Sequence, residues 1–145
     1  MGSCKGAILM QTFLPHDDFE KTVKCLDFRR LCKQRVEAMQ IYNIISGKSK
    51  KNGWKNHPAV KMWISYENAL ALYHNACIRE WVKRGYNNNM TFISPKGEIN
   101  YPHWLGNEEF HSSHRQTLLY KNFEWYSQFG WEEEPKYEYY WPIKK

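Results

Sequence analysis

Hydrophobic residues recur at helical spacing along the chain, and two helices are predicted in its first third. After Pro15, the run HDDFEKTVKCL has acidic residues in its first turn, which is typical of a short helix. A longer helix is predicted from about Asp27 to Ser46, with Asp27 as its candidate N-cap. On a helical wheel its apolar arc contains Phe28, Leu31, Cys32, Met39 and Tyr42. Arg35 falls inside this arc, where it must snorkel or find a buried partner.

Two further helices are predicted in the rest of the chain. Pro58 is well placed as a first helical residue and Gly85 as a C-terminal stop, so we predict one continuous helix of about seven turns between them. A last helix is predicted from about Asn107 to Lys121, after which WYSQFGW becomes irregular. No alternating strand pattern is longer than MTFIS.

These patterns predict a mainly α fold, a compact single domain of three principal helices with long irregular loops and an aromatic C-terminal segment. Residues 10–145 are predicted to form this domain, which is large enough to bury a real core. Residues 1–9 are interpreted as an N-terminal extension that is disordered or not part of the functional chain.

Composition narrows the class of protein. No apolar run approaches the length of about 18 residues that a transmembrane helix needs, and the start MGSCKGAILM is too short for a signal peptide. The four cysteines show neither CxxC spacing nor the density of a disulfide framework, so we expect reduced thiols, mostly in the core. We therefore expect a soluble protein that is not secreted.

Positive charge is concentrated in one region of the sequence. Residues 28–66 contain nine Lys or Arg and a single acid, a net charge of +8 against +6 for the whole chain. A basic region on a nearly neutral remainder is typical of a polyanion binder. Aromatic residues make up 17% of the chain and can stack on unpaired bases, although core packing is the more general use of such side chains.

The single acid of the basic region, Glu37, has two open interpretations. Arg30, Lys33 and Gln34 precede it on the same helix face. An exposed salt bridge to Lys33, one turn earlier, would contribute only about 0.3–0.5 kcal/mol. Alternatively, because a carboxylate repels the phosphates that the bases attract, its presence there points to chemistry. A carboxylate beside a sugar carbon can stabilise an oxocarbenium-like transition state and then act as a base.

Other candidate sites are weaker. His111 and His114 are three residues apart on a predicted helix and can share a metal, but no third ligand has suitable spacing, so the structural interpretation is favoured. Ser112 or Ser113 beside His114 suggests a nucleophile and base, yet adjacent helical residues point about 100° apart and no elbow motif is present. Phosphate-cradling glycine loops are absent. We predict no metal and no cofactor.

Three blocks of sequence resemble a known family. They are LCKQRVEA on the long helix, VKMWISYENALALYHNACIREWVKRGY with its KRGY ending, and the aromatic EWYSQFG near the C-terminus. Together they span most of residues 26–131, and their order and spacing agree with the predicted helices. The chain resembles, as a distant member, the pyrimidine dimer DNA glycosylases of the phage endonuclease V type. These are small all-helical enzymes that cut the glycosidic bond at ultraviolet photoproducts and then nick the strand.

The resemblance implies roles for particular residues. The family's nucleophile is the α-amine of the mature N-terminus, which would be Met10 here, and the position that matches its assisting glutamate is Glu37. Lys33, one turn from Glu37, is the reserve nucleophile. The side chains predicted to contact DNA are Arg29, Arg30, Lys33, Gln34, Arg35, His114, Arg115, Trp125 and Tyr126.

The chain also departs from the family pattern. The equivalent start is MQTFLP at Met10, preceded by nine residues, so either translation begins at Met10, or the extension is removed, or the amine chemistry is lost. An arginine immediately before the family's glutamate is Val36 here, and one soon after it is replaced by residues such as Gln40. These departures bear on pyrimidine dimer specificity more than on the fold.

The leading functional hypothesis is a DNA repair glycosylase with abasic-site lyase activity. It would act through an imine on damaged pyrimidines, such as pyrimidine dimers, in duplex DNA, without a cofactor. The expected partner is double-stranded DNA with damaged or abasic sites, bound by a monomer in the cytoplasm or wherever DNA resides, with no membrane involved. Alternatives are a non-catalytic DNA-binding module on the same scaffold and an interaction protein whose basic face meets an acidic partner.

Overall fold

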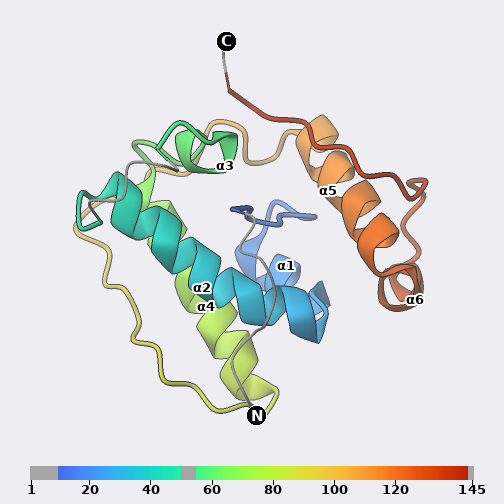
Figure 1. Cartoon of the computed structure of the whole chain (residues 1–145), viewed down its shortest axis with the longest axis horizontal. Coiled ribbons are helices and arrows are strands. Elements are labelled where there is room, and N and C mark those ends of the chain that lie inside the picture. Colours follow the sequence, from blue (N-terminus) through green and yellow to red (C-terminus); the bar gives the residue numbers. More distant parts are fainter. Residues whose placement is uncertain (1–9, 50–54, 144–145) are drawn as a thin grey trace.

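The computed structural model describes residues 10–49 and 55–143, and these residues form helices without any strand. The elements are α1 (Phe19–Cys25), α2 (Phe28–Ile45), α3 (Pro58–Lys61), α4 (Glu67–Lys83), α5 (Glu108–Lys121), α6 (Phe123–Tyr126) and the 3-10 helix η1 (Ser127–Phe129). Long irregular segments connect α4 to α5 and follow η1 (Figure 1). The predicted mainly α fold is confirmed. No helix within the described ranges is long and apolar enough to cross a membrane.

The long helices begin and end where their caps are found in the sequence. Asp27 and Ser46 are the caps of α2, and Asn107 caps α5 by accepting a hydrogen bond from the Phe110 backbone N–H. The helix predicted between Pro58 and Gly85 is instead divided into α3 and α4. WYSQFGW, predicted to be irregular, contains the last two residues of α6 and all of η1.

The division between α3 and α4 brings a large side chain into the core. Ser65 has a φ of 75°, in the left-handed region that ends a right-handed helix. Trp63, just before this turn, is fully buried, and its indole N–H donates to Thr12 Oγ1 at 3.0 Å. Helical periodicity continues through this stretch of sequence and does not predict the break, which coincides with the burial of Trp63.

The two longest helices pack against each other and form the main core. α2 contributes Leu31 and Ile41, and α4 contributes Leu70 and Ile78, all without solvent exposure. In Figure 1 the N-terminal segment passes between this pair and α5. We define the N-terminal segment as residues 10–15, and every residue in it is buried. The core therefore contains a stretch of non-helical backbone.

Side chains of α2 and α4 satisfy the backbone of this buried segment. Gln34 is fully buried, and its amide accepts from the Phe13 N–H at 2.9 Å and donates to the Gln11 carbonyl at 2.8 Å. Tyr73 donates to the Phe13 carbonyl at 2.8 Å. Because buried backbone groups without partners are costly, these bonds stabilise a stretch of non-helical backbone inside a helical core.

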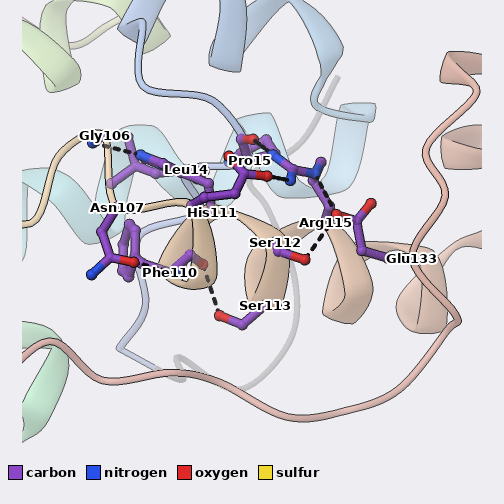
Figure 2. A network of polar contacts seen from close by, with 11 residues as sticks. Leu14, Pro15, Gly106, Asn107, Phe110, His111, Ser112, Ser113, Arg115 and Glu133 are labelled. Atoms are coloured by element: carbon purple, nitrogen blue, oxygen red, sulfur yellow. Dashed lines mark hydrogen bonds and ion pairs between the residues drawn. The ribbon is translucent and has the colours of Figure 1, made fainter.

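Two histidines of α5 hold the next residue of the segment. His114 Nδ1 accepts the Leu14 N–H at 2.9 Å, and His111 Nδ1 bonds to the Leu14 carbonyl at 2.7 Å. His111 Nε2 accepts the Gly106 N–H at 2.9 Å, so the His111 proton is on Nδ1 and is donated to Leu14 (Figure 2). The i, i+3 spacing of the histidines thus matches the backbone N–H and carbonyl of one residue, Leu14. Within the described residues no group of three or more His, Cys, Asp or Glu converges as a metal site.

These histidines make the fold sensitive to acid. Burial lowers the pKa of His114 from 6.5 to about 3, and burial also lowers the pKa of His111. Below pH 6.5 these histidines become protonated in the unfolded chain but stay neutral in the folded chain. The free energy of unfolding should therefore fall as the pH drops from 6.5 toward 3. We expect a loss on the order of a few kcal/mol, since one pKa unit corresponds to about 1.4 kcal/mol.

Urea unfolding of His114→Asn at several pH values tests this expectation. The asparagine amide oxygen can still accept from the Leu14 N–H, but it does not titrate, so the acid-dependent slope should become shallower. His103→Asn is the matched control, because His103 is exposed. Equal slopes for wild type and both variants would show that the Leu14 contacts are not the acid-sensitive element.

The neighbouring polar residues of α5 hold the irregular segments in place. Arg115 Nη1 donates to the Pro15 carbonyl at 2.8 Å, and Arg115 Nε and Ser112 Oγ both donate to Glu133 Oε2, at 2.9 and 2.8 Å (Figure 2). Ser113 Oγ donates to the Phe110 carbonyl at 2.8 Å. Neither serine forms a nucleophile and base pair with His114, because each hydroxyl is used elsewhere.

The cysteines follow the prediction only in part. Cys25 and Cys77 are free thiols buried in the core, as expected. Cys32 is disulfide-bonded, so the expectation of reduced thiols is wrong for this residue. Cys4 lies outside the described residues.

Candidate active site

A pocket of about 230 Å³ lies where α2, the N-terminal segment, the end of α5 and the C-terminal segment, defined as residues 136–141, meet. Its polar lining is Gln11, Arg30, Lys33, Gln34, Glu37 and Lys121. Its remaining lining is Met10, Phe13, His57, Tyr137, Tyr139 and Trp141. The pocket therefore brings together the three predicted catalytic residues, two on α2 and one in the N-terminal segment.

Glu37 is buried in this pocket and does not lie on an open helix surface. Only 5% of the residue is exposed, and its Oε2 accepts a hydrogen bond from Gln34 Nε2 at 3.1 Å. Burial raises the pKa of Glu37 to about 8, although Lys33, the Gln34 bond and Lys121 act in the opposite direction. Near neutral pH this carboxyl can therefore donate a proton or accept one.

The geometry does not support the salt-bridge interpretation of Glu37. Among the described residues, no ion pair joins Glu37 to Lys33. The salt-bridge interpretation places Glu37 on an exposed helix face, but the N-terminal segment covers part of this face of α2. This cover makes Glu37 a desolvated carboxyl inside a pocket.

Gln34 links Glu37 to the N-terminal segment. Its amide nitrogen donates both to Glu37 and to the Gln11 carbonyl, so one side chain fixes the carboxyl and the backbone next to Met10. Its oxygen accepts from the Phe13 N–H and shares the single proton of the Tyr73 hydroxyl with the Phe13 carbonyl. Gln34, which was predicted to contact DNA, is fully buried, lines the pocket and makes these internal bonds.

The basic residues of α2 separate into two groups. Arg30 and Lys33 line the pocket, Arg30 also pairs with Asp27 at 3.2 Å, and Arg29 is exposed beside them. Arg35 is buried, and its guanidinium lies 4.0 Å above the Trp81 ring, a cation–π contact. Of the two alternatives predicted for Arg35, snorkelling or a buried partner, the structure shows a buried partner, Trp81.

The residues in the last third of the chain that were predicted to contact DNA also divide by burial. Tyr126 is fully buried, and its hydroxyl donates to the Asp27 carboxylate at 2.5 Å, so Asp27 makes no side-chain cap bond to α2. Burial is the largest cause that raises the pKa of the Tyr126 hydroxyl. Trp125 remains partly exposed, with its indole N–H donating to the Cys25 carbonyl at 2.8 Å. His114 and Arg115 make the internal bonds described above.

Sequence reasoning missed several residues of the pocket. Lys121, the last residue of α5, is half-buried, and burial together with Arg30 and Lys33 lowers the pKa of its ammonium. Its Nζ lies 4.8 Å from the centre of the Tyr137 ring. No local pattern marks Lys121 as a neighbour of Glu37, because the two are separated by more than half of the chain.

The fold and the pocket define a helical protein that holds a desolvated carboxyl among basic and aromatic side chains. The model of the family described as pyrimidine dimer DNA glycosylase matches residues 10–94, more than half of the chain, and the protein belongs to this family. It is therefore a member of a DNA glycosylase family, with DNA as the class of substrate. No curated protein and no solved structure matches the chain.

The matched range contains only part of the pocket. It begins at Met10 and includes Lys33 and Glu37. Lys121 and the aromatic residues at 137–141 lie beyond its end. The family match therefore covers the side of the pocket that contains Glu37. It does not cover the side formed by Lys121 and the aromatic residues at 137–141.

Proposed function

We propose that the protein is a DNA repair glycosylase with abasic-site lyase activity, acting on damaged pyrimidines such as pyrimidine dimers in duplex DNA. The observation that carries the proposal is the raised pKa of Glu37 in a pocket that also contains Met10 and two lysines. Family membership supports the same substrate class. In this proposal the protein acts as a monomer wherever the damaged DNA is held.

The proposed chemistry needs one amine and one carboxyl. A neutral amine attacks C1′ of the damaged nucleotide, and the C–N glycosidic bond breaks as the new C–N bond forms. The base leaves with the bonding electrons and accepts a proton, for which the protonated Glu37 is the proposed donor. The attacking nitrogen loses a proton, the C1′–O4′ bond breaks while O4′ takes up a proton, and the opened sugar holds a protonated imine at C1′. Removal of a C2′ proton by the Glu37 carboxylate then expels the 3′ phosphate and nicks the strand.

The proposed amine is the α-amine of a chain that starts at Met10, with Lys33 in reserve. Met10 is only 4% exposed and lines the pocket with Glu37, which suits a group that must reach the same sugar carbon. Lys121 joins the candidates because it lines the same pocket and burial lowers its pKa. No cofactor is required, because the amine itself forms the reactive imine.

The proposed contacts with DNA phosphates come from the accessible basic side chains. Arg29, Arg30 and Lys33 lie along α2 at the mouth of the pocket or beside it, where they can neutralise phosphates flanking the lesion. Trp125 is partly exposed and can stack on a base. The other residues predicted for DNA contact support the site through internal contacts in this proposal; they are Gln34, Arg35, His114, Arg115 and Tyr126.

Incubation with an abasic-site duplex tests the proposal most directly. Nicking of the strand supports the enzyme, whereas binding without nicking supports the alternative of a non-catalytic DNA-binding module. Absence of both would favour an interaction protein whose basic face meets an acidic partner. A pyrimidine dimer duplex, compared with duplexes that carry other single lesions, then tests the proposed lesion class.

Phosphate contacts predict a strong dependence of DNA affinity on salt. We expect the affinity to fall by orders of magnitude between low and near-physiological salt, with a slope of about −0.9 per phosphate neutralised. The double variant Arg30→Ala with Lys33→Ala should flatten this slope, as measured by fluorescence anisotropy titrations. Lys83→Ala is the control, because Lys83 is an exposed lysine at the end of α4 that does not line the pocket. A salt-insensitive affinity would contradict the electrostatic grip.

A further inference from the structure

His57 brings the beginning of α3 into the lining of the pocket. It is the N-cap of this helix, and its Nδ1 accepts the Ala59 N–H at 3.1 Å. Its backbone carbonyl accepts from the N–H groups of Val60 and Lys61, at 2.9 and 3.0 Å. The side chain and the backbone of His57 are therefore both held by α3 at a place where the ring lines the pocket.

The cap bond decides which nitrogen of the His57 ring carries the proton. A neutral imidazole has one N–H donor and one acceptor nitrogen, and Nδ1 is the acceptor here. The proton is therefore on Nε2. The polar group that this ring can offer to a molecule in the pocket is thus an N–H donor, because its acceptor nitrogen is used in capping α3.

The His57 ring is also kept neutral. Burial lowers its pKa from 6.5. A proton on Nδ1 would in addition set two donors against each other in the cap bond to Ala59. Arg30, Lys33 and Lys121 line the same pocket as basic side chains. His57 therefore adds a neutral donor to a pocket that already contains several groups suited to phosphates.

His57 lies beside the C-terminal segment. The centres of the His57 and Trp141 rings are 6.1 Å apart, and the two rings are nearly perpendicular, at 88°. The basic side chains of the pocket come instead from α2 and from the end of α5. Because the neutral donor comes from a different part of the lining, we expect it to meet a different part of the nucleotide.

The proposed glycosidic step creates a need for such a donor. When the bond from the sugar to a pyrimidine breaks, the base takes the bonding electrons, and negative charge spreads from its ring nitrogen to its carbonyl oxygens. A fixed N–H donor beside such an oxygen stabilises this charge as it develops. The carbonyl is uncharged before the reaction, so the contact strengthens in the transition state, which is what accelerates a step. An abasic sugar has no such oxygen.

We infer that His57 is a catalytic residue of the glycosidic step, in which its Nε2–H donates a hydrogen bond to a carbonyl oxygen of the departing pyrimidine. The proton stays on His57, and Glu37 remains the proposed source of the proton that the base accepts. The inference rests on the proposed function and adds to it the group that stabilises the leaving base. Steps on a baseless sugar do not need this donor.

Two duplexes of identical sequence separate these steps. One duplex carries a pyrimidine dimer and the other an abasic site at the same position. Single-turnover reactions are quenched and treated with alkali, which breaks the strand at every baseless site. Breaks in the dimer duplex then report the glycosidic step, and cleavage of the abasic duplex without alkali reports the lyase step.

His57→Asn removes the donor and keeps the cap. The asparagine oxygen lies near the place of Nδ1, and asparagine is a preferred N-cap residue, so the melting temperature should stay close to that of wild type. We expect the glycosidic step to slow by about 10²- to 10³-fold, the range that loss of one such donor gives. Cleavage of the abasic duplex should stay within about twofold of wild type, because that substrate has no leaving base.

His57→Gln makes the opposite change. The longer glutamine side chain carries an N–H donor near the place of Nε2, so it should recover most of the glycosidic rate. Glutamine is not a preferred N-cap residue, so this variant should have the lower melting temperature of the two. His103→Asn is the matched control, because His103 is exposed and does not line the pocket, and it should change neither reaction.

The outcomes distinguish this inference from the proposed function. Slow glycosidic cleavage by His57→Asn alone, with recovery by His57→Gln, is the result we expect. Wild-type rates for His57→Asn, equal losses on the two duplexes, or a glutamine variant that recovers nothing would each overturn the donor while leaving a working enzyme. A wild-type chain that cleaves neither duplex, or only the abasic one, would overturn the proposed glycosylase function and the inference with it.

Discussion

Glu37→Gln should reduce strand cleavage at an abasic site by about 10²- to 10⁴-fold, the range in which general acid–base groups contribute. The substitution preserves the size of the side chain and can keep a hydrogen bond to Gln34, but it removes the group that gives and takes a proton. DNA binding should be kept or strengthened, because the variant lacks the negative charge that repels phosphates. Single-turnover cleavage and anisotropy binding on the same duplex measure the two effects separately.

Stability provides the control for this variant. The folded pKa of Glu37 is raised from 4.5 to about 8, so the folded chain holds an extra proton in that window and loses stability as the pH rises through it. Glu37→Gln should remove this loss and be more stable than wild type above pH 8. Glu134→Gln, at an exposed acid, should change neither cleavage nor stability. If Glu37→Gln unfolds the chain or leaves cleavage intact, Glu37 is a structural residue.

Borohydride reduction in the presence of abasic-site DNA should trap a covalent adduct on a chain that starts at Met10. An α-amine titrates near about 7.7–8.0 and is substantially neutral at physiological pH, whereas a lysine near about 10.4 is mostly charged. The chain that starts at Met1 should trap poorly, because its Met10 nitrogen is part of a peptide bond. Peptide mass spectrometry would locate the adduct.

The position of the adduct distinguishes the possible nucleophiles. An adduct on Lys33 or Lys121 would overturn the terminal-amine assignment while preserving the lyase proposal, and Lys121 has the lowered pKa that such a role needs. Lys33→Arg and Lys121→Arg keep the positive charge and remove the primary amine, so each tests one lysine directly. Trapping that survives in both variants supports the α-amine. Absence of any adduct, with DNA binding intact, would favour the non-catalytic module.

Local signals in the sequence were sufficient to predict the two helices, α2 and α5, that contribute residues to the pocket. Asp27 and Ser46 were predicted as the limits of the long helix, and both are caps of α2. Asn107 and Lys121 were predicted as the limits of the last long helix, which they are for α5. Helix caps and apolar periodicity depend on residues close together in the sequence, so they can be recognised without knowledge of the fold. Glu37 was also identified from the sequence, because a lone acid among bases is a local feature.

Contacts between distant segments were decided only by the tertiary structure. The burial of Glu37 depends on the N-terminal segment, which Gln34 and His114 hold through bonds across 23 and 100 residues of sequence. The sequence around Gln34 or His114 does not indicate such a distant partner. The break at Ser65 likewise coincides with the burial of Trp63, which helical periodicity alone does not predict.

The two sides of the pocket illustrate the same division. The carboxyl side lies on a single helix, α2, where spacing along the sequence determines which side chains share a face. The opposite side comes from Lys121 and residues 137–141, which reach the pocket only because the C-terminal segment is fixed along α5 by Ser113 and Thr117. Periodicity specifies neighbours within an element, whereas the path of an irregular segment is set by side-chain hydrogen bonds to residues far away in sequence.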